Sequence, residues 1–252
     1  MKKTIVGILG YGEIGKALSL FYKNKKRYKL LLKDLKFDQF GNQKIDILNV
    51  AVPCFSQRQF VDAIVPVIKK NKPKLVIIHS TIVPGTTKKL IQKTKAKIVH
   101  SPVRGVHPKL YQGIKTFVKF IGCEDFRVGQ SVQKHFQSIG IKKVKIFKPA
   151  LATELNKLID TTYYAHCIVF TDYIERLLKK YKISFETFQL FNLSYNQGYK
   201  KLGKSNVVRP TLIPMSKFKT GRKIGGHCQI PNAKILEKIY PDSVTKHILR
   251  YK

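Results

Sequence analysis

Three groups of residues in this chain could take part in catalysis or in binding a cofactor. The first is a glycine-rich hexamer, GYGEIG, at residues 10–15. The second is a glutamate followed three residues later by a lysine, Glu154 and Lys157. The third is the segment KIGGHCQIPN at residues 223–232, where Cys228 could be a nucleophile, a metal ligand or an ordinary packing residue.

The glycine hexamer has the setting of a dinucleotide-binding turn, because it follows an apolar run and opens a segment with helical spacing. Gly10 allows the tight turn, Gly12 lets the backbone approach a pyrophosphate, and Gly15 lets helix and strand pack closely. Asp34 ends the second apolar run, where a carboxylate would bind the ribose hydroxyls and favour NAD over NADP. Neighbouring lysines at positions 33 and 36 weaken that preference, and a plain turn with a surface carboxylate is the alternative. The other expected cofactor contacts in this turn are Tyr11, Glu13 and Ile14.

Apolar patterning indicates which elements position these groups. Up to residue 148, continuous apolar runs alternate with segments of helical spacing, which predicts a doubly wound parallel sheet of the Rossmann-like α/β class. Strands are expected at 4–9, 28–34, 44–53, 74–80, 97–100, 116–122 and 143–147, and helices after the glycine turn and at 56–70, 85–94 and 125–138.

The pattern becomes helical after residue 148, with one long helix, a second near 184–200 and a last one near 232–240. We therefore predict an NAD-binding Rossmann domain at 1–148 and a smaller all-helical domain at 149–252 that carries the Cys228 loop.

Composition limits the classes of function. The chain has 252 residues and a net charge of +35, from 49 basic and 14 acidic residues. Such a field attracts polyanions, but no nucleic-acid-binding module is present, so nucleic acid is a possible partner that is not favoured. The amino terminus lacks a signal-peptide cleavage site and no apolar run is long enough to span a bilayer, which predicts a soluble protein without membrane association.

The four cysteines are far apart and form no C-x-x-C pair, so a reduced, cytoplasmic protein is expected. His227 adjoins Cys228, but no second Cys/His pair has ligand spacing, so no metal site is expected.

Four further segments, in this order, resemble those of the UDP-glucose/GDP-mannose dehydrogenase family: VAVP (50–53), STIVPGTT (80–87), ATELNKLIDTTY (152–163) and GGHC (225–228). The resemblance spans nearly the whole chain. It implies oxidation of a nucleotide-sugar alcohol to a carboxylate with two NAD, and a homodimer formed through the helical domain.

The same resemblance assigns roles to single residues. Cys228 matches the nucleophile that traps an aldehyde as a thiohemiacetal, which then loses a second hydride and becomes a thioester. That chemistry needs a thiol that can ionise, which nearby lysines favour. Lys157, paired with Glu154, matches a lysine that acts as acid/base and stabilises developing oxyanions. Thr81 matches a threonine near nicotinamide and substrate, and the resemblance makes Thr81, Val52 and Pro53 further expected cofactor contacts.

Several positions depart from the family pattern. Thr161 replaces an asparagine and Asn232 replaces an aspartate, two residues that serve thioester hydrolysis in the family. Val103 replaces a loop glutamate, and His107 is the nearest titratable substitute. The family's third, nucleotide-gripping domain is not expected in this chain. A smaller anionic substrate would suit basic and glycine residues near the site, namely Arg104, Arg209, Arg222, Lys223, Gly225 and Gly226.

Three hypotheses follow. The first is an NAD-dependent oxidoreductase acting on an alcohol of a sugar or nucleotide sugar, with Cys228 as a covalent participant. The second is a single-hydride dehydrogenase of the 3-hydroxyacid or 6-phosphogluconate type, acting on a small anionic substrate with Cys228 idle. The third is a non-catalytic member that binds NAD or a polyanion.

Overall fold

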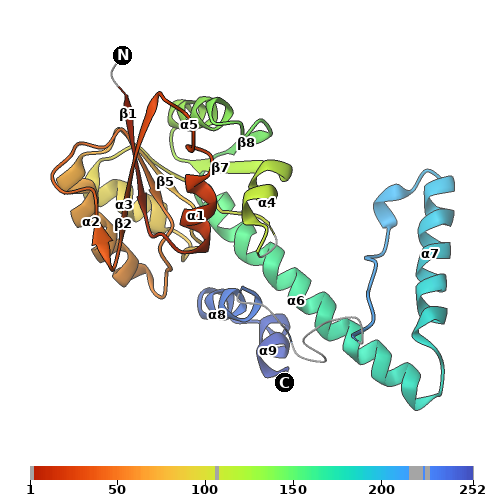
Figure 1. The fold of residues 1–252 in the computed structure, drawn as a ribbon. Coiled ribbons are helices and arrows are strands. Elements are labelled where there is room, and N and C mark those ends of the chain that lie inside the picture. Colours follow the sequence, from red (N-terminus) through yellow and green to blue (C-terminus); the bar gives the residue numbers. More distant parts are fainter. Residues whose placement is uncertain (1–2, 106–107, 216–223, 225–227, 252) are drawn as a thin grey trace. The chain divides into compact units, whose positions relative to one another are not determined.

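A computed structural model describes the whole chain except residues 1–2, 106–107, 216–223, 225–227 and 252 (Figure 1). The chain divides into two compact units, Met1–Lys157 and Leu158–Lys252. The division falls within the long helix α6, Leu151–Lys180, which begins close to the domain boundary expected from the sequence.

The first unit contains an eight-stranded sheet, counted over the described residues, with the order β3-β2-β1-β4-β5-β6-β7-β8. Strands β2, β1, β4, β5 and β6 run parallel, and β8 runs parallel to β7. The strands are β1 Thr4–Leu9, β2 Tyr28–Asp34, β3 Phe37–Asp38, β4 Ile47–Val50, β5 Leu75–Ile78, β6 Ile98–His100, β7 Lys119–Cys123 and β8 Val144–Phe147. This arrangement confirms the predicted Rossmann-like α/β class.

The sequence predicted a parallel sheet, but two of the strand pairs are antiparallel. The short strand β3 folds back on β2, and β7 runs antiparallel to β6. An apolar run reports that a strand is buried but does not report its direction. The chain returns from β6 through the short helix α4, Leu110–Thr116, and enters β7 at the edge where β6 ends.

Helices cover both faces of this sheet (Figure 1). One core cluster joins the sheet to α2 and α3, and another joins it to α1, α4 and α5. Side-chain caps start two of these helices: Ser56 accepts from the Gln59 N–H, and Asp125 from the Arg127 N–H. The bounds are α1 Glu13–Ser19, α2 Gln57–Asn71, α3 Thr86–Thr94 and α5 Phe126–Ser138.

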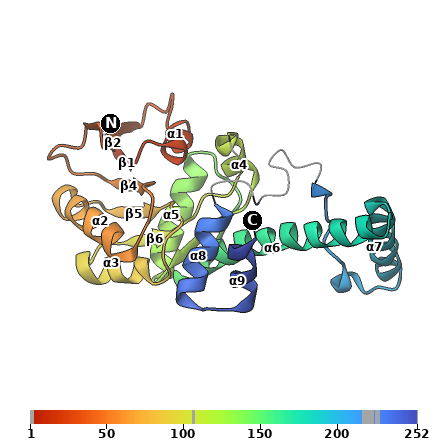
Figure 2. The ribbon, with the colours of Figure 1, turned by 90° about the horizontal axis from the view of Figure 1, so that it is seen from below.

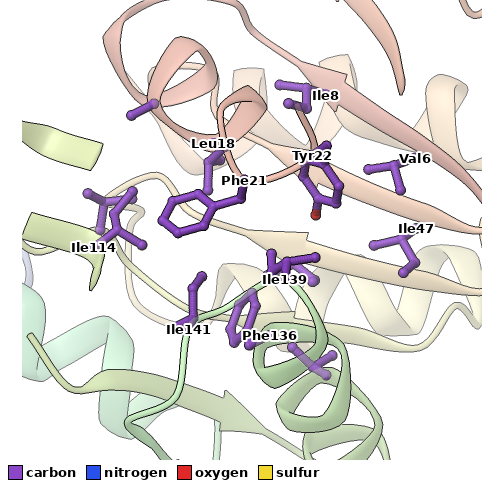
Figure 3. Packing of buried hydrophobic residues seen from close by; sticks show 14 of the residues in the cluster. Val6, Ile8, Leu18, Phe21, Tyr22, Ile47, Ile114, Phe136, Ile139 and Ile141 are labelled. Atoms are coloured by element: carbon purple, nitrogen blue, oxygen red, sulfur yellow. The ribbon is translucent and has the colours of Figure 1, made fainter. Parts of the chain in front are cut away.

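The core on the α1, α4 and α5 side is densely aliphatic and aromatic. Figure 3 shows Phe21 and Leu18 meeting Ile114, Ile139 and Ile141 between these helices and the sheet. Because this burial involves residues from far-apart segments, it fixes the ends of α1 and α5 against each other.

The second unit is helical, as predicted, and continues α6 with α7 (Phe185–Lys201), a short 3₁₀ turn (Ser205–Val207), α8 (Gln229–Ile239) and α9 (Ser243–Arg250). Helices α8 and α9 lie side by side (Figures 1 and 2). A small core joins Ala165 and Val169 of α6 to Ala233 of α8 and Ile248 of α9. The sequence pattern did not predict β3, α4 or α9, because all three are short. No helix in the described part of the chain is long and apolar enough to cross a bilayer.

Candidate functional site

The glycine turn has the geometry that a bound diphosphate requires. Gly10 has a φ of +91°, which L-residues with a side chain rarely adopt. A Cβ on Gly15 would lie 2.0 Å from the Gly10 carbonyl oxygen, so helix α1 can pack against the turn only through a glycine. A Cβ on Gly12 would meet no atom within 4 Å, which leaves open space in front of the first N–H groups of α1.

Asp34 stands at the end of β2 and is tied to the same turn. Its carboxylate accepts the N–H of Tyr11 and, at 2.7 Å, the N–H of Leu35. These two backbone donors hold the pKa of Asp34 below its ordinary value, so the side chain is an anion at neutral pH. The adjacent Lys33 pairs with Asp38 across the β2–β3 ladder at 2.5 Å. One of the two lysines that weakened the preference for NAD therefore already faces a carboxylate.

A cavity of about 610 Å³ lies beside this turn. It falls where the chain leaves β1 toward β2 on one side and resumes at β4 on the other, the switch point at which open α/β sheets bind ligands. Tyr11, Glu13 and Ile14 lie in the turn and at the start of α1. The expected contacts Gly10, Gly12, Asp34, Val52 and Pro53 line the cavity, together with Phe55 and residues of α2 that include Gln59, Phe60 and Ala63. The size and lining of this cavity fit one nucleotide half of a dinucleotide.

Glu154 is buried, with 1% of its surface exposed, and it caps α3. Its carboxylate accepts the N–H of Gly85 at 2.6 Å, the N–H of Thr87 at 2.9 Å and the Thr87 hydroxyl at 2.6 Å. Burial raises the pKa of Glu154, and these donors oppose the rise. Because free N–H groups at a helix start need acceptors, this geometry gives Glu154 a structural role: it fastens α6 to the loop that leads into α3.

Thr81 and Lys157 lie on elements that a buried histidine joins. His100, the last residue of β6, has Nδ1 2.8 Å from the Thr153 hydroxyl and Nε2 3.0 Å from the Ser80 carbonyl oxygen. Ser80 precedes Thr81, and Thr153 precedes Lys157 by one helical turn. Burial lowers the pKa of His100 to about 3, and the positive charge of Lys157 contributes to that lowering. The structure thus brings the segments of Thr81 and Lys157 together at the carboxyl ends of β5 and β6.

Lys119 at this edge was not singled out from the sequence. It is buried, and its ammonium donates to the carbonyl oxygens of Ser101 at 2.6 Å and Pro102 at 3.0 Å. Its Nζ also lies 3.3 Å from Nδ1 of His79, whose Nε2 is 2.9 Å from Asn49 Oδ1. Burial lowers the pKa of Lys119 well below its ordinary value. Only the reversed direction of β7 brings this lysine to the edge where the other strands end.

In the second unit, Cys228 is half-buried and directly precedes α8. The Asn232 N–H donates to the Cys228 carbonyl oxygen at 3.1 Å. The buried Asn232 side chain donates through Nδ2 to the Thr161 hydroxyl at 2.7 Å. Asn232 and Thr161, two of the three positions that depart from the pattern of the family the sequence resembles, are therefore direct partners joined by a neutral hydrogen bond.

The remaining expected site residues have varied positions. Val103 is buried, and the Arg104 guanidinium lies over the rings of Phe117 and Phe120. Arg209 stacks on Tyr195, 4.1 Å from the ring centroid. Within the described ranges, no three His, Cys, Asp or Glu side chains gather as metal ligands would. Five predicted site residues lie outside the described residues: His107, Arg222, Lys223, Gly225 and Gly226.

No protein-family model and no curated protein matches this sequence. Solved structures do match in fold. UDP-D-ManNAc dehydrogenase from Pyrococcus horikoshii matches with a TM-score of 0.74 at 16% identity, over 98% of this chain and 68% of that one. UDP-glucose dehydrogenase from Pyrobaculum islandicum matches with a TM-score of 0.70 at 15% identity, over 99% and 68%.

A third match is 3-hydroxyisobutyrate dehydrogenase from Mycobacterium tuberculosis, with a TM-score of 0.70 at 13% identity, over 98% of this chain and 92% of that one. The chain thus spans about two thirds of the length of the two nucleotide-sugar dehydrogenases and most of the length of the third protein. At identities this low, the structural matches establish only the fold, a Rossmann-like sheet followed by helices.

Proposed function

We propose that this chain is an NAD-dependent dehydrogenase that oxidises an alcohol of a sugar or nucleotide sugar. One observation carries the proposal: the open glycine turn, the Asp34 carboxylate and the cavity beside them form one continuous surface at the switch point of the sheet. The fold shared with two nucleotide-sugar dehydrogenases supports the substrate class.

The residues present fit NAD. The free space at Gly12 admits a diphosphate to the start of α1, and the anionic Asp34 suits ribose hydroxyls while disfavouring a 2′-phosphate. NAD, when bound, supplies the hydride acceptor. In this proposal Lys157 takes the hydroxyl proton as the hydride leaves the substrate carbon, and Thr81 contacts the reacting alcohol. Glu154 and His100 position these two residues by fastening α6 to the β5–α3 loop.

Cys228 is the proposed nucleophile for an aldehyde formed in the first oxidation. Asn232 stands where the resembled family has the aspartate that serves thioester hydrolysis, and its side-chain amide, which donates to Thr161, cannot act as a carboxylate. We therefore expect the first hydride transfer to be faster than the release of an acid.

A second candidate is a single-hydride dehydrogenase acting on a small hydroxy acid. The observation that favours it is the shared fold with 3-hydroxyisobutyrate dehydrogenase, which extends over 92% of that protein. In this candidate Lys157 keeps its role and Cys228 has none.

The helical unit is the proposed homodimer surface. Large apolar side chains stay exposed along α6 and α7 of a single chain, among them Tyr163, Phe170, Tyr173, Leu190 and Phe191. Exposed apolar area of this extent is typical of protein interfaces.

NADH production by the purified chain separates these candidates. The substrates are a panel of nucleotide sugars, their sugars and small 3-hydroxy acids. For a nucleotide sugar, Cys228→Ser should keep one hydride transfer per substrate and lose the second. Lys157→Met should lower kcat by about 100-fold or more, as expected for loss of a general acid/base.

The matched control is Lys180→Met, an exposed lysine of the same helix, which should have wild-type activity. If Cys228→Ser leaves the number of hydrides and the rate unchanged, the hydroxy-acid candidate replaces the first. If calorimetry detects no binding of NAD, both dehydrogenase candidates fail and the non-catalytic hypothesis remains.

A further inference from the structure

A second cavity lies on the side of the sheet that α1, α4 and α5 cover. It encloses about 500 Å³ and shares no lining residue with the cavity beside the glycine turn. Three separate segments line it: the turn after α1, helix α4 and the connection from α5 to β8. The lining residues are Leu20, Phe21, Lys23, Lys25, Tyr111, Lys115, Ile139, Gly140, Lys142 and Lys143.

Five of these ten lining residues are lysines, and none is acidic. Three basic residues of the first unit that form ion pairs, Lys33, Arg58 and Lys74, do not line this cavity. Five ammonium groups around one cavity repel one another, and a multiply charged anion bound among them would remove that repulsion.

The floor of this lysine-lined cavity is apolar and aromatic. Phe21 and Ile139 are buried, and the Tyr111 ring centroid lies 4.7 Å from that of Phe21. Figure 3 shows Phe21 close to Ile139 and Ile141 in the core beneath. The Lys115 ammonium lies over the Tyr111 ring, 5.6 Å from its centroid, so one of the five cationic groups contacts the aromatic part of the cavity.

The backbone that carries the lysines is anchored. The Lys25 N–H donates to the carbonyl oxygen of buried Tyr22 at 3.2 Å. Ile141 is buried directly before Lys142, and its N–H donates to the Phe136 carbonyl oxygen at 2.9 Å. Since the rim is held by buried neighbours, a ligand would have to order only the lysine side chains.

We infer that this cavity binds an oligophosphate, the chain of two or three phosphates found in a nucleotide or in inorganic polyphosphate. Lysine ammonium groups bind phosphate oxygens through charge-assisted hydrogen bonds, and the volume suits a small ligand. A local cavity of about 500 Å³ fits such a ligand better than a nucleic acid strand, which needs a continuous basic groove. This site goes beyond the proposed dehydrogenase activity and does not depend on it.

Calorimetry of the full chain with inorganic tripolyphosphate tests the site. The variant Lys142→Gln/Lys143→Gln removes two of its charges, and Lys69→Gln/Lys70→Gln is the matched control. The control pair is also adjacent and exposed, ends α2 and lies outside the cavity. We expect the first variant to weaken binding by about tenfold or more and the control by less than about twofold.

Two results with tripolyphosphate would overturn the inference. Equal weakening by both variants would show that the diffuse positive field, rather than the cavity, holds the anion. Displacement of tripolyphosphate by NAD that is equally strong in the wild type and in Lys142→Gln/Lys143→Gln would place the anion at the glycine turn instead. NAD affinity measured on the same variants reports the cofactor site separately, so failure of either site is visible by itself.

ATP and the variant Tyr111→Ala distinguish the two sources of oligophosphate. If the aromatic floor holds a base, Tyr111→Ala weakens ATP binding and leaves tripolyphosphate binding unchanged. If both ligands keep their affinity in this variant, the phosphate chain itself is the ligand. A single-stranded oligonucleotide that binds more tightly than either, and equally to both lysine variants, would contradict a small-molecule site.

Discussion

Gly12 and Gly15 have different physical reasons to be glycine. A Cβ at position 15 would collide with the backbone oxygen of Gly10, whereas a Cβ at position 12 would enter empty space. Gly12 also has an extended backbone, with φ −73° and ψ −158°, which an alanine can adopt. Position 12 is thus open for a ligand, whereas packing requires a glycine at position 15.

We therefore predict that one alanine substitution weakens NAD binding and that the other lowers the stability of the fold. Gly12→Ala should unfold at the wild-type urea concentration but bind NAD at least about tenfold more weakly, because its methyl group occupies the approach to the phosphates. Gly15→Ala should lower the free energy of unfolding by about 2 kcal/mol or more, because α1 must move. Urea titration and calorimetry with NAD measure both. Wild-type affinity in Gly12→Ala would show that the turn does not hold the cofactor.

At the scale of elements, α3 depends on a side chain from α6. Three donors at the start of α3 end on the Glu154 carboxylate, 67 to 69 residues away along the chain. A glutamine could still accept the Thr87 donors through its oxygen, but its amide would face the Gly85 N–H. That N–H would be buried without an acceptor.

We predict that Glu154→Gln lowers the free energy of unfolding by about 2 kcal/mol, within the range for a buried unsatisfied donor. Asp160→Asn is the control, because it changes an exposed carboxylate of the same helix and should cost less than about 0.5 kcal/mol. Both values come from urea unfolding followed by circular dichroism. Equal stability of the two variants would argue against the capping role of Glu154.

The direction of β7 has a comparable consequence. Lys119 begins this strand and holds Ser101 and Pro102 through their carbonyl oxygens. In a parallel strand the same lysine would lie at the opposite edge of the sheet. The reversal therefore supports the segment that leads to Val103 and Arg104, at the edge where Thr81 and Lys157 lie.

At the scale of the whole molecule, buried histidines make the fold sensitive to acid. Burial lowers the pKa of His100 to about 3 and of His135 to about 4, and it lowers the pKa of His79 well below the ordinary value. In the unfolded chain these side chains titrate near pH 6.5. Between these pKa values the unfolded chain binds more protons than the folded chain, so stability is lost as the pH falls below about 6.5.

We predict that each buried histidine costs about 2 kcal/mol of unfolding free energy between about pH 7 and about pH 5. His135→Gln should remove the contribution of one histidine, about 2 kcal/mol, from the change in unfolding free energy between these two pH values. The hydrogen bond between His135 and the Tyr22 hydroxyl is lost at both pH values, so its contribution cancels from the slope. His247→Gln, an exposed histidine, should leave the slope unchanged. An unchanged slope in His135→Gln would contradict a neutral buried side chain.

Local pattern predicted much of the fold. The expected strands 4–9 and 28–34 agree with β1 and β2 residue for residue. In β1 the continuous apolar run reflects burial of most of the strand, whereas β2 is mostly half-buried and was marked by its three consecutive leucines. The expected helix starts at residues 56 and 184 also agree with the structure, in which Ser56 and Ser184 cap α2 and α7. The short elements β3, α4 and α9 escaped because two to eight residues carry too little periodicity to show a pattern.

The layered α/β class, the glycine turn and the carboxylate that follows it can be predicted from the sequence, because these features depend on residues close together along the chain. The tertiary structure alone decided the direction of β7, the cap that Glu154 provides, the contact between Asn232 and Thr161, and the gathering of five lysines around one cavity. These features join residues tens of positions apart. Burial and hydrogen-bond satisfaction select such contacts only when the whole chain has folded, and no local pattern encodes them.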